Sequence, residues 1–377
     1  MRLLPLLIFF ALINFYASGR IIKAWPVLQE NLGWAVIAAI TFFVLQLAGF
    51  FGDHMAFPRW KKNRFLKPVV IALDWVSYLC FGIMSLLVVY GIFLDIVGLV
   101  WKWLAPSRND IDYHLQLKLL VMVALTVVIG MWQALGGPKV KRIEIKLKDL
   151  PDTFDGFTIA QISDLHVGPT IGRRYAQKVV NMTNGLKADM IALTGDFVDG
   201  NVDDLATGVA PLAQLKAPDG VFFVTGNHEF YWDAQAWIEK FRQLGARVLL
   251  NEHEVIKRGG QSIVIAGILD LSAGHRSDPV EALRGTRPED IIILLAHQPG
   301  SYAAAHKAGV DLQLSGHAHG GQYFPFSLVI RFFQKYHQGL NLHDSMYVYV
   351  SNGTGYWGPP LRTFVPAEIT LHTLRRA

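Results

Sequence analysis

The sequence has a single cysteine, Cys80, among 377 residues. A disulfide framework needs paired cysteines and a Cys-rich zinc site needs several, so both are excluded. Cys80 lies in an apolar stretch, and one such thiol leaves the redox compartment undecided. The chain also has no internal repeat and no low-complexity segment, so a repeat architecture is not indicated.

Polar residues are scarce in the N-terminal third. The chain is 52% hydrophobic, and its mean hydropathy of +0.30 is high for a soluble protein. The excess lies in four apolar stretches, residues 3–18, 33–51, 68–89 and 119–135. Most of them are long enough to cross about 30 Å of hydrocarbon. We therefore predict an α-helical transmembrane region over residues 1–138 with about four spans. Two alternatives stay open: the first stretch is a signal sequence, and residues 95–103 extend the third as an interfacial helix.

Basic residues next to the apolar stretches predict the orientation. They form two clusters: Arg59, Lys61, Lys62, Arg64 and Lys67 before the third stretch, and Lys139, Lys141, Arg142 and Lys146 after the fourth. The loop at residues 108–118 has no basic excess. Since cytoplasmic loops are enriched in Lys and Arg, both clusters and the C-terminal domain are expected in the cytoplasm, with the chain multi-pass in the cell (inner) membrane. Arg20 and Lys23 count mildly against this orientation.

The two clusters also account for part of the net charge of +5. Basic residues beside a membrane favour anionic lipid headgroups, so the lipid bilayer is the predicted partner. Nucleic-acid binding is the weaker interpretation of the same charge, and no nucleic-acid partner is predicted. The sequence indicates no protein partner and no oligomeric state.

The second part of the chain alternates between two periodicities. Gly136-Gly137-Pro138 predicts a hinge, and a domain over residues 139–377 follows it. Short apolar runs at 158–163, 190–194, 221–225, 291–295 and 312–314 read as buried strands, and 173–186, 234–244 and 301–307 read as helices. About nine strands are expected. The alternation predicts an α/β domain, and the number of strands suggests two sheets packed face to face and flanked by helices. Alternation alone does not separate that sandwich from a doubly wound fold.

Potential metal ligands follow five of these strands. The motifs are Asp164-Leu165-His166, Gly195-Asp196, Gly226-Asn227-His228-Glu229, Ala296-His297 and Gly316-His317-Ala318-His319. Singly, a strand-terminal Asp is usually a turn residue and an isolated His is usually a hydrogen-bonded core residue. Together they supply carboxylate, imidazole and amide oxygen, which suit divalent ions such as Mn, Fe or Zn. No structural rule demands such a series, so a metal site is predicted.

The order and chemistry of these motifs resemble those of the calcineurin-like metallophosphoesterases. Two further stretches, Gly320-Gly321-Gln322 and residues 351–360, resemble the membrane-anchored bacterial branch, and the resemblance covers about residues 140–372. It implies the two-sheet fold and a two-metal site. Asp164, His166 and His319 would bind one ion, Asn227, His297 and His317 the other, and Asp196 would bridge both. Two such ions about 3.5–4 Å apart clamp an in-line displacement at phosphorus, so phosphoester hydrolysis is the implied reaction.

The resemblance also implies two catalytic residues. His228 would donate a proton to the leaving group, and Asp199 would orient its ring and raise its basicity. The alternative for Asp199 is a turn residue of the Asp199-Gly200 pair. In phosphoprotein phosphatases an arginine that grips phosphate stands where this chain has Gly200. Arg173, Arg174 or Arg362 could meet the substrate's charge instead, or be solvated surface cations.

The stretch at residues 323–336, called here the apolar loop, is the clue to the substrate. It follows His319 closely and contains Arg331 and Lys335 among the apolar or aromatic residues Tyr323, Phe324, Phe326, Leu328, Val329, Ile330, Phe332 and Phe333. Such a loop either packs into the domain or lies against lipid. We expect a membrane-anchored phosphoesterase that cleaves a phosphodiester or pyrophosphate bond in a membrane lipid or lipid-linked precursor. The alternatives are a phosphatase or nucleotide phosphodiesterase on a soluble substrate, and a non-catalytic metal- or phosphate-binding membrane sensor.

Overall fold

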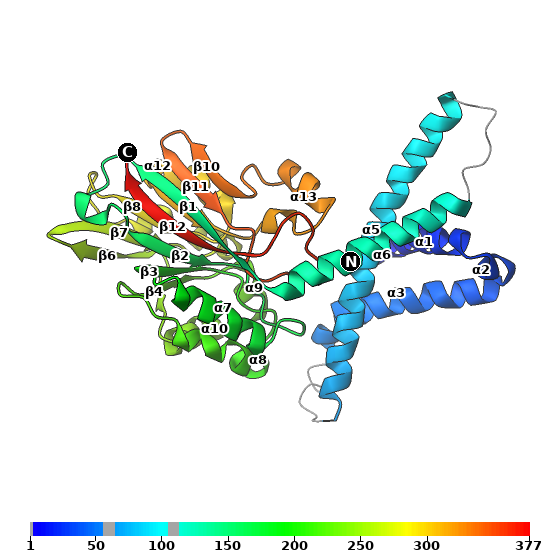
Figure 1. Ribbon diagram of the computed structural model, residues 1–377. Coiled ribbons are helices and arrows are strands. Elements are labelled where there is room, and N and C mark those ends of the chain that lie inside the picture. The colour runs from blue at the N-terminus through cyan, green and yellow to red at the C-terminus, as the bar shows by residue number, and fades with distance from the viewer. Residues whose placement is uncertain (1–2, 56–64, 105–112) are drawn as a thin grey trace. The chain divides into compact units, whose positions relative to one another are not determined.

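The computed structural model describes residues 3–55, 65–104 and 113–377 (Figure 1). It divides into two compact units. One comprises Met1–Trp132 with Gly358–Leu361, and the other comprises Gln133–Trp357 with Arg362–Ala377. Most of the first basic cluster, Arg59 to Arg64, and part of the loop predicted to lie outside, residues 108–112, fall outside the described residues.

The first unit is helical. Its helices are α1 (Leu3–Ala24), α2 (Pro26–Glu30), α3 (Leu32–Met55), α5 (Lys67–Leu104) and α6 (Tyr113–Gly136). The four predicted apolar stretches fall in α1, α3, α5 and α6. Helix α5 runs through residues 95–103 without a break, and its 38 residues correspond to about 57 Å. That length exceeds the hydrocarbon thickness of a bilayer.

Two of the described helices, Lys67–Leu104 and Leu115–Gly136, are long and apolar enough to cross a membrane by length and composition. The helical unit exposes many large apolar side chains, among them Phe15, Trp34 and Val128. Its buried polar groups are paired in part: the side-chain amides of Asn14 and Gln46 exchange hydrogen bonds of 3.1 and 2.8 Å between α1 and α3.

The second unit contains two six-stranded sheets within the described residues. The first has the order β1 (Lys139–Leu147), β12 (Glu368–Arg376), β2 (Thr158–Ile162), β3 (Met190–Thr194), β4 (Val221–Val224), β5 (Arg247–Val248). The second has the order β10 (Gly339–His343), β11 (Met346–Val350), β9 (Leu312–Ser315), β8 (Ile292–Leu295), β7 (Gln261–Gly267), β6 (Glu252–Arg258). These twelve strands exceed the nine predicted. Strand β5 has two residues, too few for a periodic pattern.

Helices flank the two sheets. They are α7 (Arg173–Gly185), α8 (Val202–Val209), α9 (Asn227–Trp232), α10 (Ala234–Gln243), α11 (Pro279–Ala282), α12 (Tyr302–Lys307) and α13 (Phe326–Val329). The 3-10 turns are η1 (Asp152–Phe154), η2 (Ala210–Gln214), η3 (Leu271–Arg276), η4 (Pro299–Ser301), η5 (His319–Gly321) and η6 (Ile330–Phe332).

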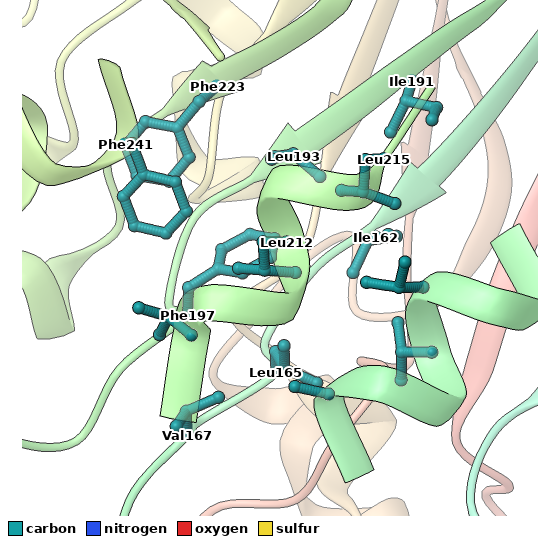
Figure 2. Packing of buried hydrophobic residues seen from close by; sticks show 14 of the residues in the cluster. Ile162, Leu165, Val167, Ile191, Leu193, Phe197, Leu212, Leu215, Phe223 and Phe241 are labelled. Atoms are coloured by element: carbon teal, nitrogen blue, oxygen red, sulfur yellow. The ribbon is translucent and has the colours of Figure 1, made fainter. Parts of the chain in front are cut away.

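Alternate strand residues pack into different cores, because successive side chains point to opposite faces of a sheet. Ile159 and Ile293 lie in the core between the sheets. Phe223 faces the helices instead, and its ring stacks on Phe241 of α10 with centroids 3.9 Å apart (Figure 2). Ala305 of α12 packs on the outer face of the second sheet. The layers are therefore helix, sheet, sheet, helix, which confirms the predicted sandwich and excludes a doubly wound single sheet.

Strand direction places the predicted motifs together. Strands β2, β3 and β4 are parallel neighbours, as are β8 and β9. The carboxyl ends of parallel neighbours share one edge of a sheet, and ligand sites in α/β proteins form at that edge. All five motifs follow the carboxyl ends of these five strands.

Candidate metal centre

The first group of converging ligands comprises Asp164, His166 and His319, whose ligand atoms lie within 4.8 Å of one another. His166 Nε2 is 3.1 Å from His319 Nε2, which is 3.3 Å from Asp164 Oδ1. All three residues are buried. The structure thus brings together the three residues that the resemblance assigns to one ion.

The second group comprises Asp196, His297 and His317. His297 Nε2 lies 3.0 Å from Asp196 Oδ2 and 3.2 Å from Asn227 Oδ1. The other ring nitrogen, Nδ1, lies 2.8 Å from the Thr194 carbonyl oxygen and can donate to it. When the ring is neutral, this hydrogen bond keeps the proton on Nδ1 and leaves the Nε2 lone pair for a metal ion.

These donor sets fit divalent ions. Two ligands bound tetrahedrally at 2.0–2.2 Å from one ion are about 3.3–3.6 Å apart, and the separations within the groups are 3.0–3.3 Å. Imidazole, carboxylate and amide oxygens are ligands of Mn, Fe and Zn. The nearest donors are therefore within a few tenths of an ångström of the spacing of groups bound to a common ion.

The charged groups of the site shift one another's pKa values. Burial alone would raise the pKa of Asp196, but the neighbouring His297, followed by His228, lowers it strongly. Burial opposes protonation of His297, yet the Asp196 carboxylate raises its pKa well above the usual value. In His319 burial dominates and lowers the pKa to about 4. Since a ligating imidazole must be neutral, metal binding has to displace the proton that Asp196 stabilises on His297.

The backbone is left-handed at five predicted ligands. Asp164, His166, Asp196, His317 and His319 have φ between 50° and 69°. Residues other than glycine adopt this conformation rarely, at a cost of about 1–3 kcal/mol each. Such conformations cluster at functional sites, where the surrounding structure imposes them. Their concentration here shows that the strand ends turn sharply to direct these side chains inward.

Two motif glycines leave space for the ligands. A Cβ at Gly226 would overlap the Asp196 backbone and carboxylate, and one at Gly316 would overlap the Asp164 carboxylate. Neither glycine has a positive φ, so its role is close approach rather than backbone freedom. At Gly226 and at Gly316, the backbone therefore packs directly against a carboxylate.

Asp199 lies between His228 and His166. Its Oδ1 is 2.5 Å from His228 Nδ1 and 3.1 Å from His166 Nδ1. Burial opposes protonation of His228, but the Asp199 carboxylate outweighs it and raises the pKa of His228 to about 9. His228 Nε2 remains directed toward the centre, 3.8 Å from Asp196 Oδ2. The turn interpretation of Asp199 does not account for these two contacts.

Sequence reasoning assigned no role to Glu229. Its carboxylate is fully buried and accepts backbone N–H bonds from Asp196, Phe197 and Gly226 at 3.0, 2.8 and 2.6 Å. Burial and the charge of Asp196 raise the pKa of Glu229 to about 7. Glu229 thus connects the loop after β3 to the start of α9. The signal was available in the motif, because a carboxylate two residues after Asn227 can reach these amides.

Arg362 does not fit the prediction of a substrate-binding or surface cation. Its side chain is fully buried. Nε, Nη1 and Nη2 donate to the backbone carbonyls of Gly355, Val365 and Asn352 at 2.9, 3.1 and 2.8 Å, and Nη2 lies 3.2 Å from His319 Nδ1. The guanidinium therefore fixes the loops behind His319. Sequence alone could not distinguish this buried arginine from Arg173 and Arg174, which are exposed.

Two exposed aromatic rings border His228. Tyr231 and Trp357 have ring centroids 5.1 and 5.7 Å from that of His228, and they are 65% and 51% exposed. They come from α9 and from the loop after β11, more than 120 residues apart in sequence. His228 itself is only 8% exposed. A group that approaches its ring from solvent meets these aromatic side chains.

Comparison with known proteins shows which family and which relatives this chain is similar to. Residues 157–321 match the family model described as calcineurin-like phosphoesterase. The chain is 35% identical over 325 residues to a transmembrane protein with metallophosphoesterase domain of Danio rerio, covering 80% of this chain and 74% of that one. It is 31% identical over 360 residues to an uncharacterized metallophosphoesterase of Helicobacter pylori, covering 94% and 93%.

Solved structures are more distant. The NAD nucleotidase of Haemophilus influenzae is 19% identical with a TM-score of 0.36, and the similarity covers 53% of this chain and 50% of that one. For the 5'-nucleotidase precursor of Thermus thermophilus the values are 17%, 0.35, 58% and 54%. This chain therefore matches about half the length of these two proteins.

Proposed function

Because this chain belongs to the calcineurin-like phosphoesterase family, we propose that it is a membrane-anchored two-metal enzyme acting on a membrane phosphodiester or pyrophosphate. The family assignment makes it a metal-dependent phosphoesterase. The number of ions, the bond cleaved, the lipid nature of the substrate and the orientation in the membrane belong to the proposal.

The two ligand groups have separate roles in the proposed reaction at phosphorus. Asp164, His166 and His319 would hold one ion, Asn227, His297 and His317 would hold the other, and Asp196 would bind both. When bound, such ions neutralise phosphoryl oxygens and activate water as a nucleophile. The chain's own contribution is to orient the ligands through buried hydrogen bonds, such as that between His297 Nδ1 and the Thr194 carbonyl.

His228 is the general acid. Its Nδ1 is held by Asp199, and its Nε2 is free to donate a proton to the leaving oxygen. The pKa of about 9 keeps the ring protonated at neutral pH. A leaving group that receives this proton must lie beside His228, hence against Tyr231 and Trp357. These exposed rings favour a leaving group that presents an apolar or planar surface beside the acid.

The apolar loop carries the lipid assignment. Phe332 and Phe333 are 82% and 78% exposed, whereas Tyr323 is buried at 6%. The loop therefore packs into the domain at its start and presents apolar side chains at η6. Arg331, also exposed, adds a cation next to them. An exposed apolar surface with basic residues fits acyl chains near an anionic headgroup.

The remaining parts of the proposal follow from sequence. The transmembrane region at residues 1–138 anchors the domain at residues 139–377, and the basic clusters direct that domain to the cytoplasmic face of the cell membrane. The similarity to a transmembrane protein with metallophosphoesterase domain of Danio rerio supports the anchoring.

A soluble nucleotide phosphodiester is the second candidate substrate. Tyr231 and Trp357 favour it, because exposed aromatic rings beside the catalytic acid can stack on a planar base. It differs from the lipid in its dependence on the apolar loop, which a soluble nucleotide would not need.

The test compares two substrates on one preparation. In Phe332→Ser/Phe333→Ser, we expect the rate on a phospholipid or lipid pyrophosphate in mixed micelles to fall at least tenfold, since each buried Phe contact contributes about 1.5–3 kcal/mol. A small chromogenic phosphodiester should be cleaved at the wild-type rate. Val280→Ser, which removes a 69% exposed apolar side chain on α11, is the control. Equal loss on both substrates would refute the lipid assignment, and unchanged rates would favour the soluble nucleotide.

Phe324 is kept out of this variant. Its side chain is half-buried, and its ring contacts Phe364 with centroids 6.2 Å apart. Substituting Phe324 would therefore disturb packing as well as any lipid contact.

A further inference from the structure

A second group of metal-binding side chains lies outside the candidate centre. It consists of His306 near the end of α12 and of His343 and Asp344 at the turn between β10 and β11. One ligand atom from each lies within 4.8 Å of the other two. The two histidines are 37 positions apart in sequence, so only the folded chain joins them. We propose that this group, called here the hairpin site, binds a zinc ion.

The hairpin site is separate from the candidate centre. Strand β11 runs parallel to β9, with Tyr347 beside Leu312 and Val350 beside Ser315. The ligands His317 and His319 follow the carboxyl end of β9, whereas the β10–β11 turn precedes the amino end of β11. The two sites therefore lie at opposite ends of these strands, about 10 Å or more apart at a rise of about 3.3 Å per residue.

The distances in the hairpin site suit an ion better than hydrogen bonds. Asp344 Oδ2 is 3.9 Å from His306 Nδ1 and 4.0 Å from His343 Nε2. Both separations are too long for a hydrogen bond. Two ligands at 2.0–2.2 Å from a zinc ion are about 3.3–3.6 Å apart in tetrahedral geometry. A shift of about half an ångström, available to the exposed Asp344, would bring its carboxylate to ligand spacing from both rings.

Neighbouring side chains orient the His343 ring. The Tyr336 hydroxyl lies 3.2 Å from His343 Nδ1, and Tyr302 packs edge to face on the same ring at 4.6 Å. An Nδ1–H donated to Tyr336 leaves the Nε2 lone pair facing Asp344, which is how metal-ligating histidines are usually held. Lys335 is the nearby cation, with its ammonium over the Tyr302 and Tyr336 rings at 5.0 and 5.2 Å from their centroids.

The turn supplies the carboxylate. Asp344 has a positive φ of 53° as the first residue of a two-residue hairpin turn, and it follows the last residue of β10 directly. Two imidazoles and one carboxylate, with a fourth position open to water, form a ligand set suited to zinc. Bound zinc would connect α12 to the hairpin. Through the contact of His343 with Tyr336, it would also connect α12 to the end of the apolar loop.

The experiment counts zinc in the full-length chain purified in detergent. After removal of metals and equilibrium dialysis against low-micromolar zinc, His306→Ala/His343→Ala should bind one zinc fewer per chain than wild type. It should also keep wild-type phosphodiester hydrolysis, because the predicted catalytic ligands are intact. His337→Ala, which removes a neighbouring histidine outside the site, should bind as much zinc as wild type.

A gentler substitution guards against unfolding. Asp344→Asn preserves the size and turn preference of the residue but removes the charge, and should weaken zinc binding about tenfold or more. Equal zinc content in wild type and the double variant would overturn the proposal. If the double variant also loses hydrolysis, Asp344→Asn decides, and wild-type zinc affinity in that variant would overturn it.

Discussion

At the scale of single residues, Asp199 is the side chain with the most consequential placement. One carboxylate oxygen serves both His228 and His166, so a single charge supports the proposed acid and one predicted ligand. Asp199 raises the pKa of His228, and removing its charge must lower that pKa. The protonated acid would then be lost at lower pH.

We predict that Asp199→Asn shifts the basic limb of the kcat–pH profile to lower pH. The rate at alkaline pH should fall about 10–100-fold, as is common for residues that orient catalytic histidines and metal ligands. Metal content measured on the same sample separates this effect from loss of an ion at His166. Asp203→Asn, a neighbouring exposed aspartate, should leave the profile unchanged. If the basic limb of the kcat–pH profile is unshifted while the metal content is full, Asp199 does not support His228 as the acid.

Gly226 provides a second prediction at this scale. A methyl group there would overlap Asp196, so Gly226→Ala should displace the proposed bridging carboxylate and lower metal content and activity together. Overpacking of this kind costs about 1–3 kcal/mol, which thermal unfolding can measure. Gly245→Ala is the control for lost stability alone. Its φ of 92° strains an alanine, but the added Cβ would meet open space and displace no ligand. Wild-type metal affinity in Gly226→Ala would contradict the close approach.

At the scale of secondary-structure elements, Glu229 connects the end of β3 to α9. Its three backbone hydrogen bonds fix the loops that carry Asp196 and Asn227. A hydrogen bond to a charged group contributes about 1.5–3 kcal/mol to the stability of the fold. We therefore expect Glu229 to help position both loops independently of a bound ion.

We expect Glu229→Gln to weaken metal binding while the fold is retained, because an amide offers only one acceptor oxygen where the carboxylate uses two. Metal titration and circular dichroism on one preparation provide the measurement. Glu239→Gln on the exposed face of α10 is the control. Unchanged metal affinity would mean that the β3 and α9 loops hold their positions without Glu229.

At the scale of the whole molecule, the proposed orientation depends on the basic residues around the apolar helices. A reporter fused after Ala377 should behave as cytoplasmic, and one inserted within residues 108–112 should behave as external. Reporters active in opposite compartments check both ends of α6. A C-terminal reporter active outside the cytoplasm would overturn the orientation without affecting the family assignment.

The sequence by itself determined the order of the motifs and the α/β alternation, whereas the arrangement in two sheets was implied by the family resemblance. Buried strands that end in polar residues deliver those residues to one edge of a parallel sheet, so local pattern was enough to indicate Asp164, Asp196 and Asn227 as neighbours. Their chemistry then indicated metal. The extra strands were missed because pairing across a sheet stabilises segments as short as β5, and pairing has no local signature.

Only the tertiary structure decided which side chains are buried and which distant residues meet. The exposure of Arg362 and Phe332 is the opposite of what their hydropathy predicts. The arginine is buried and donates to backbone carbonyls, and the phenylalanine faces solvent. His306 and His343 became neighbours only when α12 packed beside the β10–β11 hairpin. Burial and long-range contact depend on how the layers pack against each other, and no periodicity along the chain contains that information.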